Sequence, residues 1–143
     1  MSSRTYEIEK PIPDDRLQAL FRGLLKEFAP GAPSARPYST EVEGRREQDN
    51  YPLTATSVYG SPQSGYRKTM SATTDPASES YLTHLRFETH GLREGIKVEY
   101  EFGGKAPWTD PETESGCGRL IVTGADSGLD ELVRLAVGAH LPG

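Results

Sequence analysis

Apolar residues recur with the period of an α-helix near both ends of the chain. In the first segment they occupy positions i, i+3, i+4, i+7, i+8 and i+11 of one stripe, which comprises Leu17, Leu20, Phe21, Leu24, Leu25 and Phe28. Asp14 and Asp15 precede this stripe, where acidic groups favour the positive end of a helix dipole, and Pro30 follows it. A second stripe follows Ser127 and comprises Leu129, Leu132, Val133, Ala136, Val137 and Leu141. The pattern predicts one helix early in the chain and one at its end.

Between these helices, apolar and polar residues alternate, which is typical of strands in an antiparallel sheet with one face in water. The clearest examples are residues 81–89 and 96–102, which flank a turn at 91–95. The apolar positions are Tyr81, Leu85 and Phe87 in the first segment and Ile96, Val98, Tyr100 and Phe102 in the second. We expect the odd positions of the first segment and the even positions of the second to face the helices.

Other segments also have the composition of strands, and turn residues separate them. They are residues 5–9, 38–42, 53–59, 66–72 and 120–122, of which the last is an apolar run that we expect to be buried on both faces. Residues 103–118 contain two prolines and four glycines, which favour a long loop. This order predicts an α+β fold, in which a single antiparallel sheet of about five to seven strands carries an early and a C-terminal helix on its apolar face. We expect residues 1–143 to form a single domain.

Composition and charge narrow the class of protein. The 143 residues include 16 basic and 21 acidic side chains, so the formal net charge is −5. An acidic balance is unfavourable for nucleic-acid binding, where a basic face supplies most of the affinity. The sequence has no run of about 18 apolar residues that could cross a membrane and no apolar segment near its N-terminus typical of a secretory signal. We therefore expect an acidic, soluble, cytoplasmic protein that binds neither nucleic acid nor a membrane.

Cys117 is the single cysteine, which excludes an internal disulfide, and it lies between two glycines that would let a substrate approach closely. A thiol becomes an effective nucleophile where a neighbouring base activates it, but the sequence shows no signature of a cysteine hydrolase. His84 and His90 are six residues apart on one predicted strand, which separates them by roughly 20 Å and prevents joint coordination of a metal. The sequence thus favours a non-catalytic protein without metal or cofactor. An enzyme that uses Cys117 is the weakest of three hypotheses.

Exposed chemistry is concentrated on the polar side of the predicted 81–102 hairpin and in the loop that follows it. Trp108 is the single tryptophan, and tryptophan is enriched among the residues that dominate binding energy at interfaces. The candidate partner-binding residues are Trp108, His84, Arg86, Glu88, Lys97, Glu99 and Glu101. The leading hypothesis is a non-catalytic protein-interaction module, such as an acidic partner or inhibitor of a basic protein.

The second hypothesis is a small domain that binds a hydrophobic ligand. The order of elements, with an early and a terminal helix flanking the strands, resembles that of helix-grip (START-like) domains. This resemblance implies a pocket between a curved sheet and the C-terminal helix. The candidate lining residues are Tyr6, Phe87, Tyr100 and Phe102. A cavity at these positions would favour ligand binding, whereas a filled core would favour the interaction module.

Overall fold

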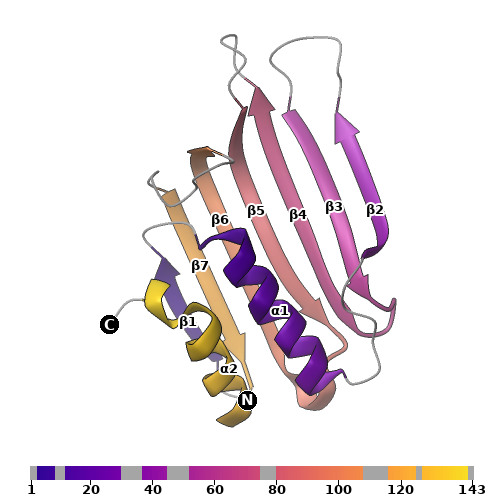
Figure 1. Ribbon diagram of the computed structural model, residues 1–143, viewed down its shortest axis with the longest axis vertical. Helices are drawn as coiled ribbons and strands as arrows, with labels where there is room; N and C mark the ends of the chain where they lie inside the picture. Colours follow the sequence, from indigo (N-terminus) through magenta and orange to yellow (C-terminus); the bar gives the residue numbers. More distant parts are fainter. Residues whose placement is uncertain are drawn as a thin grey trace.

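The computed structural model describes residues 3–8, 12–29, 37–44, 52–74, 80–107, 116–124 and 127–141. These residues form an α+β fold in which a seven-stranded antiparallel sheet carries two helices, α1 and α2, on one face (Figure 1). The elements in chain order are β1 Ser3–Ile8, α1 Asp14–Phe28, β2 Pro37–Gly44, β3 Pro52–Gly60, β4 Gly65–Thr74, β5 Ser80–His90, η1 Arg93–Gly95, β6 Lys97–Pro107, β7 Gly116–Thr123, α2 Ser127–Val137 and η3 Gly138–His140. This architecture confirms the predicted fold class.

The strands β2 to β7 follow one another across the sheet in chain order, and β1 lies at the far edge beside β7. Every neighbouring pair is antiparallel, so successive strands from β2 onward need no crossover connection. β1 is the exception, because it pairs with the last strand of the chain and places Tyr6 opposite Leu120. This pairing brings the N-terminal strand beside α2, where Arg4 forms an ion pair with Asp130.

Helix α1 buries the whole apolar stripe predicted from the sequence, and all six residues of the stripe are at most 3% exposed. Pro13 precedes the helix with a φ of −59°, and the N–H of Ala29 donates to the carbonyl oxygen of Leu25 at 2.8 Å where the helix ends. At Gly23, an added Cβ would lie 2.8 Å from Cδ1 of Leu132 in α2. The missing side chain therefore allows the two helices to pack closely.

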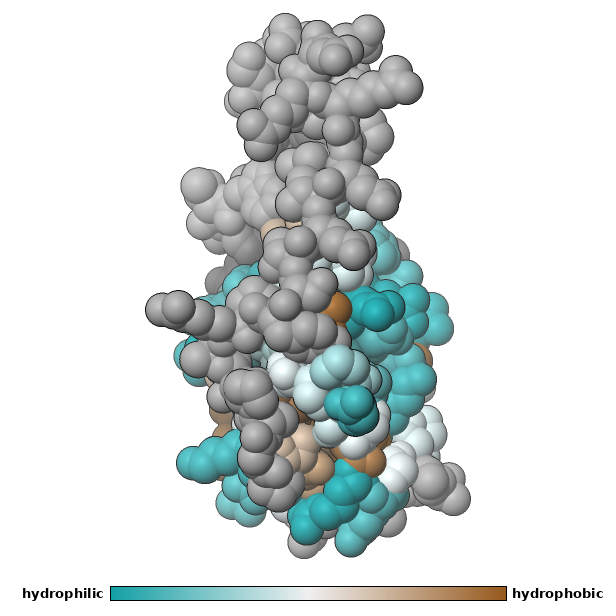
Figure 2. All heavy atoms as spheres, turned by 90° about the vertical axis from the view of Figure 1, so that its right-hand side faces the viewer, coloured by the Kyte–Doolittle hydropathy of each residue, from teal (hydrophilic) through white to brown (hydrophobic). Residues whose placement is uncertain are grey.

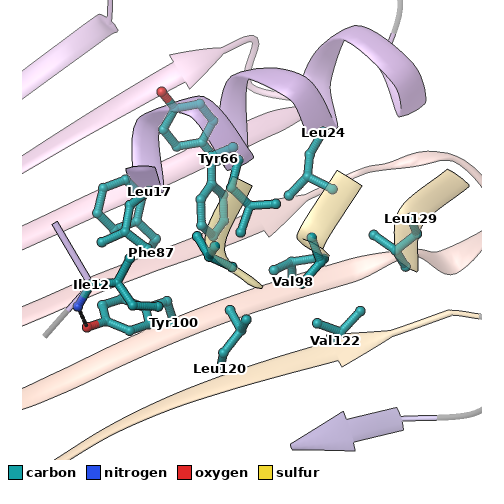
Figure 3. Packing of buried hydrophobic residues seen from close by; sticks show 14 of the residues in the cluster. Ile12, Leu17, Leu24, Tyr66, Phe87, Val98, Tyr100, Leu120, Val122 and Leu129 are labelled. Carbon is teal, nitrogen blue, oxygen red and sulfur yellow. Dashed lines mark hydrogen bonds between the residues drawn. The ribbon is translucent and has the colours of Figure 1, made fainter. Parts of the chain in front are cut away.

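The core lies between the helices and the inner face of the sheet (Figure 3). The fully buried residues of β5 and β6 are Phe87, Val98, Tyr100 and Phe102. All described odd positions of residues 81–89 and even positions of residues 96–102 are buried, which confirms the predicted faces. Phe21 of α1 contacts Phe87 with ring centroids 5.0 Å apart. The N–H of Ile12 donates to the Tyr100 hydroxyl at 3.1 Å, which satisfies a buried donor at the start of the α1 region.

The loop predicted at residues 103–118 is shorter in the structure. β6 continues to Pro107, β7 begins at Gly116, and the two strands stay paired as far as Gly104 opposite Gly116. Because glycine has no side chain, this stretch shows no alternation of apolar and polar residues, and the period that reveals the other strands is missing. Backbone pairing with neighbouring strands extends the sheet here instead.

The expectation that residues 120–122 are buried on both faces is wrong, because Ile121 is not buried. Leu120 and Val122 face the helices and are buried, whereas Ile121 lies on the opposite face and is half-buried. The described helices cover one face of this antiparallel sheet. Leu120 and Val122 are buried because they lie on that face.

Candidate functional site

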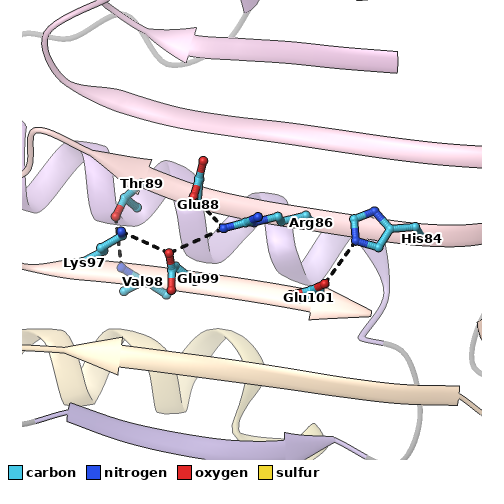
Figure 4. A network of polar contacts seen from close by, with 8 residues as sticks. All are labelled: His84, Arg86, Glu88, Thr89, Lys97, Val98, Glu99 and Glu101. Atoms are coloured by element: carbon cyan, nitrogen blue, oxygen red, sulfur yellow. Dashed lines mark hydrogen bonds and ion pairs between the residues drawn. The ribbon is translucent and has the colours of Figure 1, made fainter. Parts of the chain in front are cut away.

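The sheet face opposite the helices, the outer face, carries the charged residues predicted to bind a partner. The residues at these outward positions are His84, Arg86 and Glu88 in β5 and Lys97, Glu99 and Glu101 in β6 (Figure 4). The residues that alternate with them lie in the core. Alternation along two adjacent strands therefore brings six of the predicted side chains onto one surface, with the helices behind the sheet.

Four of these side chains form a network of ion pairs. Nη2 of Arg86 lies 3.0 Å from Oε2 of Glu88 and 3.8 Å from Oε1 of Glu99. Nζ of Lys97 lies 3.1 Å from the same oxygen of Glu99. Glu88 and Glu99 occupy opposite positions in the β5–β6 register, where like charges repel each other. Arg86 and Lys97 offset this repulsion, so the network holds the four side chains in one arrangement.

The two histidines of β5 have different partners. Nε2 of His84 lies 3.4 Å from Oε1 of Glu101 across the strand pair. Nε2 of His90 lies 2.9 Å from the carbonyl oxygen of Ser61, next to the turn between β3 and β4. The two rings share no partner among the described residues.

Neighbouring strands add charges that local sequence patterns do not assign to this surface. In the register, Glu101 lies opposite Arg119 of β7, which lies opposite Glu7 of β1. On the other side of the hairpin, Arg67 of β4 lies opposite Glu88. Strand pairing places Arg67, Arg119 and Glu7 on the outer face, and Glu7 joins it through the pairing of β1 with β7, which are distant in the chain.

Positive and negative charges balance among the side chains that the structure describes on the outer face. Its described side chains include four cations and four carboxylates, which are Arg67, Arg86, Lys97, Arg119, Glu7, Glu88, Glu99 and Glu101. The formal net charge of the whole chain is −5, so the excess of carboxylates lies outside this set. Alternating charges of this kind give an interface its orientation and specificity.

A hollow of about 240 Å³ opens on the outer face across the adjacent strands β6, β7 and β1. Its lining residues are Glu7, Glu101, Gly103, Gly118 and Arg119. At Gly103, an added Cβ would meet no atom within 4 Å, so the missing side chain leaves the hollow open. The outer face therefore has a depression beside Glu101.

Cys117 lies in β7, and the register places it opposite Gly103, which in turn lies opposite His84. The side chain of Cys117 is outside the described part of the structure, and Trp108 lies outside the described residues altogether. The roles of both residues stay predictions.

Three of the four aromatic residues considered for a ligand pocket fill the core, and the fourth, Tyr6, packs against the edge of the same cluster. Phe87, Tyr100 and Phe102 are fully buried in one packed cluster. Burial raises the pKa of Tyr100 to about 12, and its hydroxyl accepts a hydrogen bond from the backbone of Ile12. Tyr6 is half-buried and also lines a pocket between β1 and α2.

Among the residues that the structure describes, no three His, Cys, Asp or Glu side chains are grouped so that they could hold a metal ion. Within the same ranges, no helix is long and apolar enough to cross a membrane. Comparisons of the chain with protein families, with curated proteins and with solved structures found no match. The surfaces of the molecule are therefore the basis for inferring its function.

Proposed function

We propose that this protein is a non-catalytic interaction domain that binds another protein with its outer face. The observation that carries the proposal is the ion-pair network centred on Arg86 and Glu99, on a sheet face that no described helix covers (Figure 4). Side chains that are already held in one arrangement lose less conformational entropy on binding. The side chains are 25% exposed for Glu99, 45% for Arg86 and 53% for Lys97, so each keeps a surface that a partner can contact.

The proposed partner carries charges of both signs in a spacing that complements the outer face. Complementary charges fix the orientation of a complex and raise its rate of association. The net charge of −5 favours the approach of a basic protein at longer range. We therefore propose a basic partner with some acidic residues at its contact surface, for which this domain is an acidic partner or inhibitor.

Apolar contacts are scarce on the described surface. Leu135 of α2, which is 74% exposed, is the one large hydrophobic side chain exposed there. Seen from the side of β2, hydrophilic residues are interspersed with small apolar areas (Figure 2). An interface at the outer face then needs an apolar anchor from a neighbouring segment. Trp108, which directly follows β6 in the chain, is the anchor that we propose.

The two other hypotheses are weaker proposals. Phe87, Tyr100 and Phe102 fill the core, so a ligand pocket at these positions is less favoured than the interaction domain. An enzyme that uses Cys117 is supported only by the register that places Gly103 between Cys117 and His84.

The test of the interaction domain begins with the tagged full chain in its native lysate. The captured protein is identified by mass spectrometry, purified, and titrated against the parent and against variants by surface plasmon resonance at several salt concentrations. Arg86→Glu removes the cation between two carboxylates, so we expect the affinity to fall by about tenfold or more. Trp108→Ala should weaken binding by roughly 2 kcal/mol or more without lowering the melting temperature.

Arg16→Glu is the matched control, because it makes the same reversal of charge at an exposed position of α1, on the other side of the sheet. It should bind the partner like the parent. If Arg86→Glu binds normally, or if Arg16→Glu weakens binding as much, the outer face is not the interface. If Trp108→Ala binds normally but unfolds several degrees earlier, the tryptophan covers the core instead of a partner.

A further inference from the structure

A pocket of about 250 Å³ lies between the edge strand β1 and the C-terminal helical segment, on the helix side of the sheet. Its apolar lining comes from Tyr6 of β1, Val122 of β7, Val133 of α2 and Leu141. Val122 and Val133 are each 4% exposed, so they form the floor, whereas Tyr6 and Leu141 are half-buried. The pocket shares no residue with the outer face, and the inference below is independent of the proposed interaction.

Two arginines and one aspartate form the polar part of the same pocket. Nη1 of Arg4 lies 3.5 Å from Oδ1 of Asp130, and the two side chains are 62% and 41% exposed. An exposed ion pair at this distance is weak and can exchange its partner. Arg134 lies one turn after Asp130 in α2 and has no ion-pair partner among the described residues. The pocket therefore has an excess of positive charge within an acidic protein.

Gly138 leaves space beside Arg134. It lies one turn after Arg134 and lines the pocket without a side chain. An added Cβ at Gly138 would lie 3.3 Å from Cγ of Arg134. The φ of Gly138 is not positive, so alanine is compatible with the backbone, and its methyl group would narrow the pocket and press on the stem of Arg134.

We propose that this pocket binds a small organic monocarboxylate, with its carboxylate between Arg4 and Arg134 and its apolar body against Tyr6, Val133 and Leu141. Guanidinium groups match carboxylates because they donate two parallel hydrogen bonds. The Tyr6 hydroxyl and the Asp130 carboxylate raise the pKa of Arg4. Its guanidinium is charged at any working pH. Pockets for drug-sized ligands have volumes of roughly 300–1,000 Å³, so a pocket of about 250 Å³ suits a smaller molecule.

The mixed lining favours this ligand class over two simpler ones. An inorganic anion would pair with the arginines but leave the apolar floor in contact with water. A neutral hydrocarbon would cover the floor but leave the guanidinium of Arg134 without a counter-charge. A carboxylate with a compact apolar body satisfies both parts of the pocket at once.

The test is a titration of the ¹⁵N-labelled full chain with 2-naphthoate, followed by amide chemical shifts. We expect saturable shifts around the pocket, at Tyr6, Asp130 and Gly138. 2-Naphthamide has nearly the same shape without the charge. Its affinity should be lower than that of 2-naphthoate by at least about tenfold, because it cannot form the charge-assisted hydrogen bonds. Inorganic phosphate should also bind more weakly than 2-naphthoate.

Variants locate the site. Arg134→Gln should lower the affinity for 2-naphthoate by about fivefold or more, and Gly138→Ala should lower it by narrowing the pocket. Arg16→Gln removes an arginine at an exposed position of α1 outside the pocket and should leave the affinity unchanged, with melting temperatures confirming that all three variants fold. The proposal is overturned by an absence of shifts at the pocket at millimolar 2-naphthoate, by equal affinity for the naphthamide or for phosphate, or by unchanged binding in Arg134→Gln.

Discussion

Replacing Tyr100 by phenylalanine removes one oxygen atom from the core and leaves one N–H without an acceptor. Tyr100 and Ile12 are 0% and 1% exposed, and the N–H of Ile12 donates to the Tyr100 hydroxyl at 3.1 Å. A buried donor that loses its only acceptor costs about 1–3 kcal/mol, whereas the aromatic ring and its packing are kept. We therefore expect the free energy of unfolding of Tyr100→Phe to be lower than that of the parent by about 1–3 kcal/mol.

Urea unfolding followed by circular dichroism measures this difference. The midpoint should fall while the slope of the transition stays the same, because the surface exposed on unfolding is unchanged. Tyr59→Phe is the matched control: its ring stacks on Tyr66 with centroids 4.5 Å apart, and its hydroxyl has no hydrogen bond among the described residues. The control should stay within about 0.5 kcal/mol of the parent. If Tyr100→Phe is as stable as the parent, this hydrogen bond does not stabilise the attachment of the segment before α1 to the sheet.

Three further predictions concern stability and chemistry. Phe87→Asp places an unpaired charge at a fully buried position and should lower the free energy of unfolding by about 3 kcal/mol or more. Glu99→Leu on the outer face should change it by about 1 kcal/mol or less. Thermal unfolding of both variants checks this difference. Burial raises the pKa values of Tyr66 and Tyr100, the latter from 10.0 to about 12, so the unfolded chain releases these protons first as the pH rises. Stability should therefore fall as the pH rises above about 10, with the Tyr100 contribution lost by about pH 12, and urea midpoints across this range test the sign. Cys117→Ser should keep the fold and the partner binding of the parent, and Cys117 should react slowly with iodoacetamide at neutral pH; rapid labelling with an apparent pKa well below about 8.5 would support the enzyme instead.

The elements of this fold are visible in the sequence wherever side chains repeat with a regular period. The six apolar residues of α1 and the alternation along β5 and β6 predict both the type of element and the face that each buries. The outward positions of the β5–β6 hairpin, from His84 to Glu101, follow from the same alternation. These predictions are correct because the burial of one face imposes a pattern on neighbouring residues of the same element.

The pairing of strands decides what local patterns leave open. β6 extends through Gly103 and β7 begins at Gly116, although glycine-rich segments carry no period. The pairing of β1 with β7 adds Glu7 to the outer face and, on the other side of the sheet, brings Arg4 beside α2. Periodicity describes a residue relative to its own element, whereas register and the packing of helices depend on contacts between segments far apart in the chain. Consequently, the charge balance of the outer face and the pocket between Arg4 and Arg134 exist only in the folded structure.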